Sequence, residues 1–132
     1  MAFNGSAWQE AVTTTNTASG NVGVAIATNG GATTIGGSLT IGAGTAITKH
    51  LSATATLDFA NQAAVGCEVL TITVTGAAVG DTVAIGVPNG SDTTNSTFYG
   101  WVSATNTVSV KHCVVVSGNP ASGSFRVDVW QH

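Results

Sequence analysis

The chain has 132 residues, only 7% of them charged, and a formal net charge of −3. An average soluble domain has about 25% charged residues, so this composition argues against a highly soluble free monomer and favours assembly through neutral surfaces. The only three cations are Lys49, Lys111 and Arg126, which cannot neutralise a phosphate backbone, so direct nucleic-acid binding is excluded. No apolar run reaches the roughly 18 residues that cross a bilayer, which excludes a membrane span.

The first 21 residues predict an extended arm. Phe3 and Trp8 precede the polar, β-branched stretch TTTNTASGN, and nothing in this segment has a helical period. We expect the arm to dock on a partner; the alternative is a frayed terminus. The start MAFNGSAWQE lacks a charged segment followed by an apolar one, so no secretory signal is predicted and we expect synthesis in a cytoplasm.

Residues 22–48 predict a thin β-stem. Short apolar pairs alternate with glycine-rich turns, and Asn29-Gly30 is a strong hairpin signal. Such strands are too short to bury a core alone, so neighbouring chains or the C-terminal half must cover them. We therefore divide the chain into an arm and stem, 1–50, and a β-domain, 51–132.

The remainder of the chain predicts about six strands and no helix. In 52–59 and 67–75, apolar residues alternate with threonines at the period of a strand with one buried face. Several short strands with regular turns favour an all-β fold, an antiparallel β-sandwich or jelly-roll-like domain. The other expected strands are 82–87, a hairpin of 97–103 and 107–115, and a last strand that follows the loop 117–123.

No catalytic or metal-binding motif is apparent, and no cofactor is expected. His112 is in line with core valines, which favours a core or subunit-interface histidine. His112 and Cys113 are adjacent on a strand, so they point to opposite faces and cannot bind one ion together. Cys67 and Cys113 could form a disulfide, a dithiol or two unrelated buried thiols; the last interpretation is favoured, because a cytoplasmic origin disfavours a disulfide.

The carboxylates do not indicate an enzyme. Glycoside hydrolysis needs two carboxyl groups facing each other about 5–9.5 Å apart, and a small polysaccharide hydrolase would have to use residues such as Asp58 and Asp81. Asp81 follows Gly80 and is more simply a turn residue that bonds its own backbone. We expect no enzymatic activity.

An aromatic cluster lies beside the polar loop 89–96. Tyr99 and Trp101 share one face of a predicted strand, and Phe98 takes the other. One face must pack in the core, and the other can pack against a neighbouring subunit or a sugar. Tyr99 and Trp101 are therefore candidate surface-recognition residues.

Four segments resemble a β-rich module of virion proteins in tailed bacteriophages. They are GAGTAITKHLSATATLDF (42–59), LTITVTGAAVGDTVAIGVPNG (70–90), WVSATNTVSVKHC (101–113) and NPASGSFRVDVWQ (119–131). The resemblance covers about two thirds of the chain and includes no catalytic motif. It implies a role on the particle surface, commonly as a trimer, in a tail fibre or a capsid decoration ("cement") protein.

A decoration protein is the favoured expectation, since only about 50 residues precede the module and a fibre needs an attachment domain and a long shaft. The protein would be made in the host cytoplasm and reside in the virion as a homotrimer. Its partner would be the major capsid protein, contacted through Phe3, Trp8 and Val12. The alternative is a tail-fibre tip that binds tail proteins or a host surface glycan.

Overall fold

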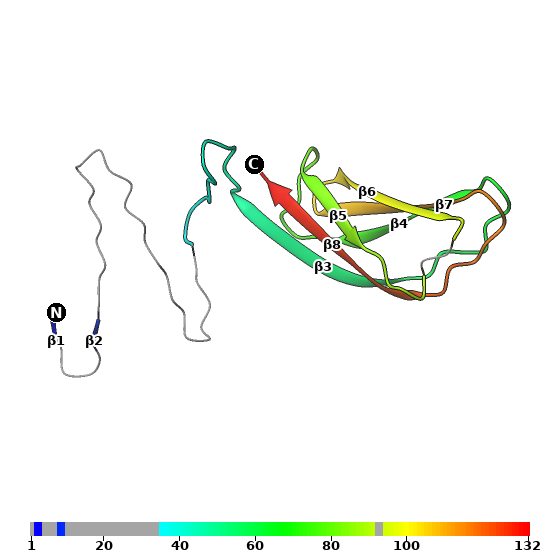
Figure 1. The fold of residues 1–132 in the computed structure, drawn as a ribbon, viewed down its shortest axis with the longest axis horizontal. Coiled ribbons are helices and arrows are strands. Elements are labelled where there is room, and N and C mark those ends of the chain that lie inside the picture. The colour runs from blue at the N-terminus through cyan, green and yellow to red at the C-terminus, as the bar shows by residue number, and fades with distance from the viewer. Residues whose placement is uncertain (1, 4–7, 10–34, 92–93) are drawn as a thin grey trace. The chain divides into compact units, whose positions relative to one another are not determined.

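The computed structural model describes residues 2–3, 8–9, 35–91 and 94–132, and the chain forms two compact units, Met1–Thr34 and Ile35–His132. In the first unit, β1 (Ala2–Phe3) and β2 (Trp8–Gln9) pair antiparallel, with Phe3 opposite Trp8 (Figure 1). Several sequence-based predictions lie outside the described residues: the role of Val12, the first part of the stem and the turn at Asn29-Gly30.

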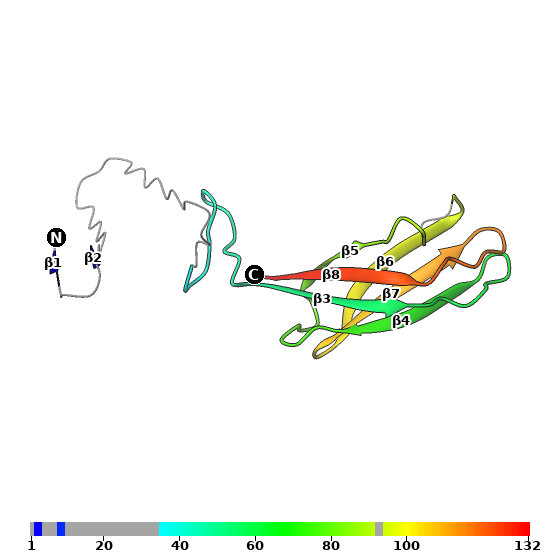
Figure 2. The ribbon, with the colours of Figure 1, turned by 90° about the horizontal axis from the view of Figure 1, so that it is seen from below.

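The second unit is the all-β sandwich that the sequence predicts. Two three-stranded antiparallel sheets have the strand orders β3-β8-β5 and β4-β7-β6 (Figures 1 and 2). Within the described residues there is no helix, and hence none that could span a membrane. The strands are β3 (Lys49–Leu57), β4 (Cys67–Thr73), β5 (Thr82–Gly86), β6 (Ser96–Ala104), β7 (Thr107–Val114) and β8 (Gly123–Gln131).

The core lies between the two sheets and is built by apolar residues that alternate with outward-facing residues along the strands. Central strands β7 and β8 have a neighbour on each side and a sheet in front, so their inward side chains are fully enclosed. Burying one valine, leucine or phenylalanine side chain contributes roughly 1.5–3 kcal/mol. The fully enclosed apolar residues of the central strands are Val108, Val110, Phe125, Val127 and Val129.

The two ends of the sandwich differ. The start of β3 and the end of β8 lie together, because Thr48 donates a backbone hydrogen bond of 2.9 Å and a side-chain hydrogen bond of 3.1 Å to the carbonyl of Gln131. The connection after β4 and the two-residue turn after β6 are at this same end, whereas the loops after β3, β5 and β7 gather at the opposite end (Figure 2).

Part of the predicted stem belongs to the same compact unit as the sandwich. In residues 35–48 a single antiparallel bridge joins Leu39 to Ile47 through two backbone hydrogen bonds of 2.9 Å. Ile35, Leu39 and Ile41 remain exposed on this segment. The described part of the stem therefore leaves apolar side chains that the sandwich does not cover.

Candidate functional site

The outer face of sheet β4-β7-β6 carries the aromatic pair. Tyr99 and Trp101 project from alternate positions of β6, their ring centroids are 5.8 Å apart, and they are 47% and 39% exposed. Phe98 points the other way and packs against the core. The prediction that Tyr99 and Trp101 share a face opposite to Phe98 is confirmed.

Two residues from neighbouring strands flank the pair. The register aligns Val69 of β4, Lys111 of β7 and Tyr99 of β6 in one row across the sheet. The Nζ atom of Lys111 lies 5.7 Å from the centre of the Tyr99 ring, a cation–π contact that contributes about 0.5–1 kcal/mol at an exposed site. We call Val69, Tyr99, Trp101 and Lys111 the aromatic platform.

The middle of the platform is closed and hydrogen-bonded. Ser109 lies opposite Trp101 on the outer side of β7, yet it is buried. Its hydroxyl donates a hydrogen bond of 2.7 Å to Ser103 Oγ, the next outward position along β6. The aromatic rings therefore stand on an ordered sheet surface.

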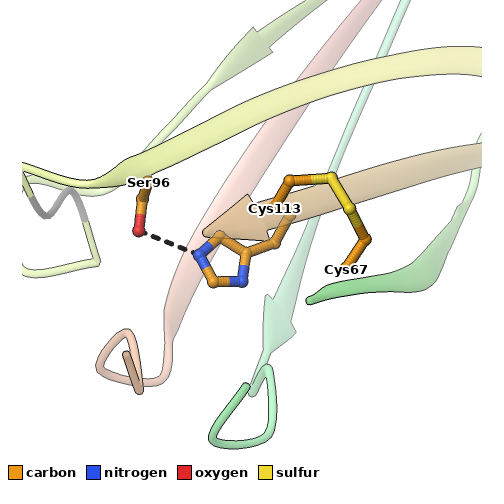
Figure 3. Close-up of a disulfide and its surroundings, with 4 residues drawn as sticks. Cys67, Ser96 and Cys113 are labelled. Atoms are coloured by element: carbon orange, nitrogen blue, oxygen red, sulfur yellow. Dashed lines mark hydrogen bonds between the residues drawn. A yellow bond between two sulfur atoms is a disulfide. The ribbon is translucent and has the colours of Figure 1, made fainter. Parts of the chain in front are cut away.

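A disulfide joins Cys67 and Cys113 in the row beside Lys111 (Figure 3). The two residues face each other in the register of β4 and β7, with their Cα atoms 4.1 Å apart. The favoured sequence interpretation, two unrelated buried thiols, is therefore wrong. Only the register between strands that are distant in sequence reveals the pairing, because spacing alone leaves it open.

His112 lies behind this face, in the core, which is one of the two positions, core or subunit interface, that the sequence leaves open. The ring stacks on Phe98 with 4.7 Å between centroids, and Nε2 shares a hydrogen bond of 2.9 Å with Ser96 Oγ. Nδ1 is buried and has no hydrogen-bond partner. Burial lowers the pKa of His112, and the charge of Glu68, its partner on β4, opposes this by raising it. His112 and Cys113 face opposite sides of β7, and in the described part of the chain no group of three His, Cys, Asp or Glu could hold a metal ion.

Asp58 and Asp81, the carboxylates that a hydrolase would need, lie at opposite ends of the sandwich. Asp81 is the turn residue that the sequence predicts: it accepts hydrogen bonds of 2.8 Å from the Ala78 amide and 2.7 Å from Gln131 Nε2, and these bonds lower its pKa. Asp58 follows the last residue of β3, which pairs with Gly123, the first residue of β8. Asp81 precedes the first residue of β5, which pairs with Trp130, the eighth residue of β8. At about 3.3 Å per residue, the two positions are roughly 23 Å apart along β8, too far for a catalytic pair.

The outer face of the other sheet carries charged groups that satisfy one another. Arg126 Nε donates a hydrogen bond of 3.1 Å to Asp128 Oδ2, and His50 Nε2 lies 3.0 Å from Asp128 Oδ1. The hydrogen bond from Arg126 is the main cause that lowers the pKa of Asp128. Trp130 stacks on His50 with 5.2 Å between ring centroids. This face therefore offers fewer unused groups than the aromatic platform.

No protein-family model, no curated protein and no solved structure matches the chain. The predicted capsid-contact residues Phe3 and Trp8 are placed only by the backbone pairing of β1 and β2. The exposed aromatic platform is thus the candidate recognition site that the described side chains define.

Proposed function

We propose that the chain is a structural protein of a bacteriophage virion, a decoration protein that binds the outer capsid surface as a homotrimer. The observation that carries the proposal is the division of the chain into a small N-terminal unit, Met1–Thr34, and a second unit that contains the disulfide-braced sandwich. One unit can hold the shell while the other forms an outward knob. The low charge and the resemblance to phage virion modules support the same function.

Binding to the major capsid protein would use apolar groups of the N-terminal unit, namely Phe3, Trp8 and Val12. The exposed Ile35 and Ile41 of the stem offer further apolar area to the shell or to neighbouring subunits. Burial of apolar surface at about 25 cal/mol per Å² would be the main source of affinity.

Trimer contacts would use the sheet edges. In the sandwich, β3 and β5 are the edges of one sheet and β4 and β6 the edges of the other, and each edge strand has unpaired backbone groups that a neighbouring chain can bond. This role needs no catalytic residue, cofactor or nucleic acid. Assembly would begin in the host cytoplasm, and the disulfide would persist in the oxidising surroundings of the released virion.

Deletion of residues 1–12 tests this function. The shortened protein should lose co-sedimentation with undecorated capsids while keeping the wild-type trimer mass and thermal midpoint. A matched pair of double variants separates the two surfaces: Phe3→Ala/Trp8→Ala should lose capsid binding, whereas Tyr99→Ala/Trp101→Ala should retain it. Full capsid binding by the deletion variant would contradict the proposal.

A tail-fibre tip that binds tail proteins or a host surface glycan is the second candidate. The exposed Tyr99–Trp101 pair favours it, because aromatic rings present a broad apolar face with a polar edge. Electron cryomicroscopy of particles separates the candidates: density over the capsid face supports decoration, and density only at the tail supports the fibre tip.

A further inference from the structure

The aromatic platform has an unusual charge for this protein. The chain has a net charge of −3, yet Lys111 is the one charged residue at the outward positions of β4, β6 and β7, all of which the structure describes. Within the described part of the chain, Lys111 forms no ion pair. The other outward positions of this face all hold neutral side chains.

We propose that the aromatic platform binds an acidic polysaccharide, a polymer of sugars that carry carboxylate groups. The C–H face of a pyranose ring would pack on Trp101 and the edge of Tyr99, and the sugar carboxylate would pair with Lys111 Nζ. Trp101 and Lys111 occupy diagonal positions on neighbouring strands, roughly 7–8 Å apart, which is within reach of one sugar ring with its substituents. The inference rests on the surface-recognition function of this face and does not depend on whether the chain sits on the capsid or the tail.

The platform is held rigid before any ligand binds. The Cys67–Cys113 disulfide fixes β4 to β7 one row from Lys111, and the hydrogen bond from Ser109, the register partner of Trp101, to Ser103 fixes β7 to β6. A site on strands whose side chains are already ordered loses little conformational freedom on binding.

The charge of this face argues against a second copy of the chain as its occupant. A contact between two platforms would bring two Lys111 side chains together with no carboxylate from either face. Like charges in a contact are unfavourable, and an unpaired buried ammonium group is more unfavourable still. A carboxylated sugar supplies the opposite charge and leaves the remainder of the lysine in water.

Affinity electrophoresis and titration calorimetry of the full chain test the inference, with polygalacturonate as the acidic polymer and dextran as the neutral one. The wild type should bind polygalacturonate and not dextran, more weakly at high salt. Trp101→Ala should lower the affinity by about tenfold or more, as expected for an aromatic contact worth over 1 kcal/mol. Lys111→Gln should lower it by roughly two- to fivefold, the range of an exposed ion pair.

Trp130→Ala, on the outer face of the opposite sheet, is the matched control and should bind as the wild type does. Thermal midpoints of all variants verify folding. Equal binding to both polymers would leave the surface-recognition function standing and overturn the acidic preference, whereas binding to neither would overturn both. Unchanged binding of polygalacturonate by Trp101→Ala would also overturn the inference. The inference would likewise be overturned if the wild type bound no sugar and Trp101→Ala changed the mass of the trimer.

Discussion

Cys67 and Cys113 are direct partners in the register of β4 and β7, and their disulfide encloses β5 and β6 in one covalent loop. The loop spans a sequence separation of 46 residues. Closing a loop of this length in the unfolded chain predicts a stabilisation of about 4 kcal/mol, and measured values are typically about 2–4 kcal/mol. We therefore expect Cys67→Ser/Cys113→Ser to lower the free energy of unfolding in urea by that amount.

Reduced wild-type protein is the control for this variant, and its urea midpoint should match that of the double variant under the same conditions. Mass spectrometry of the non-reduced wild type should show no free thiol. Two alkylated cysteines in the folded protein would contradict the disulfide.

His112 should make stability fall as the medium becomes mildly acidic. Its pKa in the unfolded chain is near 6.5, and burial lowers it in the folded protein. The unfolded state therefore binds more protons below pH 6.5, and the free energy of unfolding decreases there by at most about 1.4 kcal/mol per pH unit from this group. Above pH 6.5 its contribution is complete.

Urea unfolding at pH 8, 6.5 and 5 checks this dependence. His112→Gln should flatten the change between pH 6.5 and 5, whatever its effect on absolute stability. His132→Gln removes an exposed histidine and should leave the change intact. Asp81 and Asp128 have lowered pKa values, so their contributions are lost only below about pH 3.8, outside this window. An equally steep dependence in His112→Gln would contradict the assignment.

Gly100 is needed where β6 crosses close to β5. A Cβ atom at this position would lie 2.8 Å from Ile85 Cδ1 and 2.9 Å from the backbone oxygen of Ser109. Gly100→Ala should therefore destabilise the sandwich by about 1–3 kcal/mol through overpacking, measured as a loss in urea stability. Gly90→Ala meets no atom within 4 Å and should be nearly neutral. Similar stability of both variants would show that β5 and β6 separate easily.

Asn106, in the two-residue turn after β6, joins this turn to the connection between β4 and β5. Its φ angle is +62°, and its Oδ1 accepts a hydrogen bond of 2.6 Å from the Gly76 amide. Asn106→Ala loses the bond and strains the backbone, so we expect a destabilisation of about 2–3 kcal/mol. Asn106→Gly loses the bond alone and should cost about 1 kcal/mol. Thr105→Ala, an exposed neighbour, serves as the control, and an alanine variant no worse than the glycine variant would rule out backbone strain.

The two-residue alternation of the sequence predicted the strands and their buried faces correctly. His112 was aligned with the core valines because it continues the series of Val108 and Val110 along one strand, and the structure buries all three. The two-residue period was sufficient to predict the buried side chains, because each sheet has one face in the core and one face outside.

The pairing of Lys111 with Tyr99 could not be predicted in the same way. A hairpin with a two-residue turn places Ala104 opposite Thr107, and a regular ladder from there would place Lys111 opposite Gly100. A β-bulge between Val102 and Ala104 shifts the register by one residue, so Lys111 meets Tyr99 on the outer face. The Cys67–Cys113 pair was missed for a related reason, since it depends on the register of strands that are not neighbours in sequence.

The two hydrogen bonds that Thr48 donates to the carbonyl of Gln131 hold the start and the end of the sandwich side by side. Adjacent strands are only about 4.8 Å apart, so the two points at which the chain passes into and out of the sandwich would fit the gap of a surface turn in an unrelated protein. Foreign peptides spliced into the loops after β3 and β7 would then be displayed at the far end, about one strand length from the host scaffold.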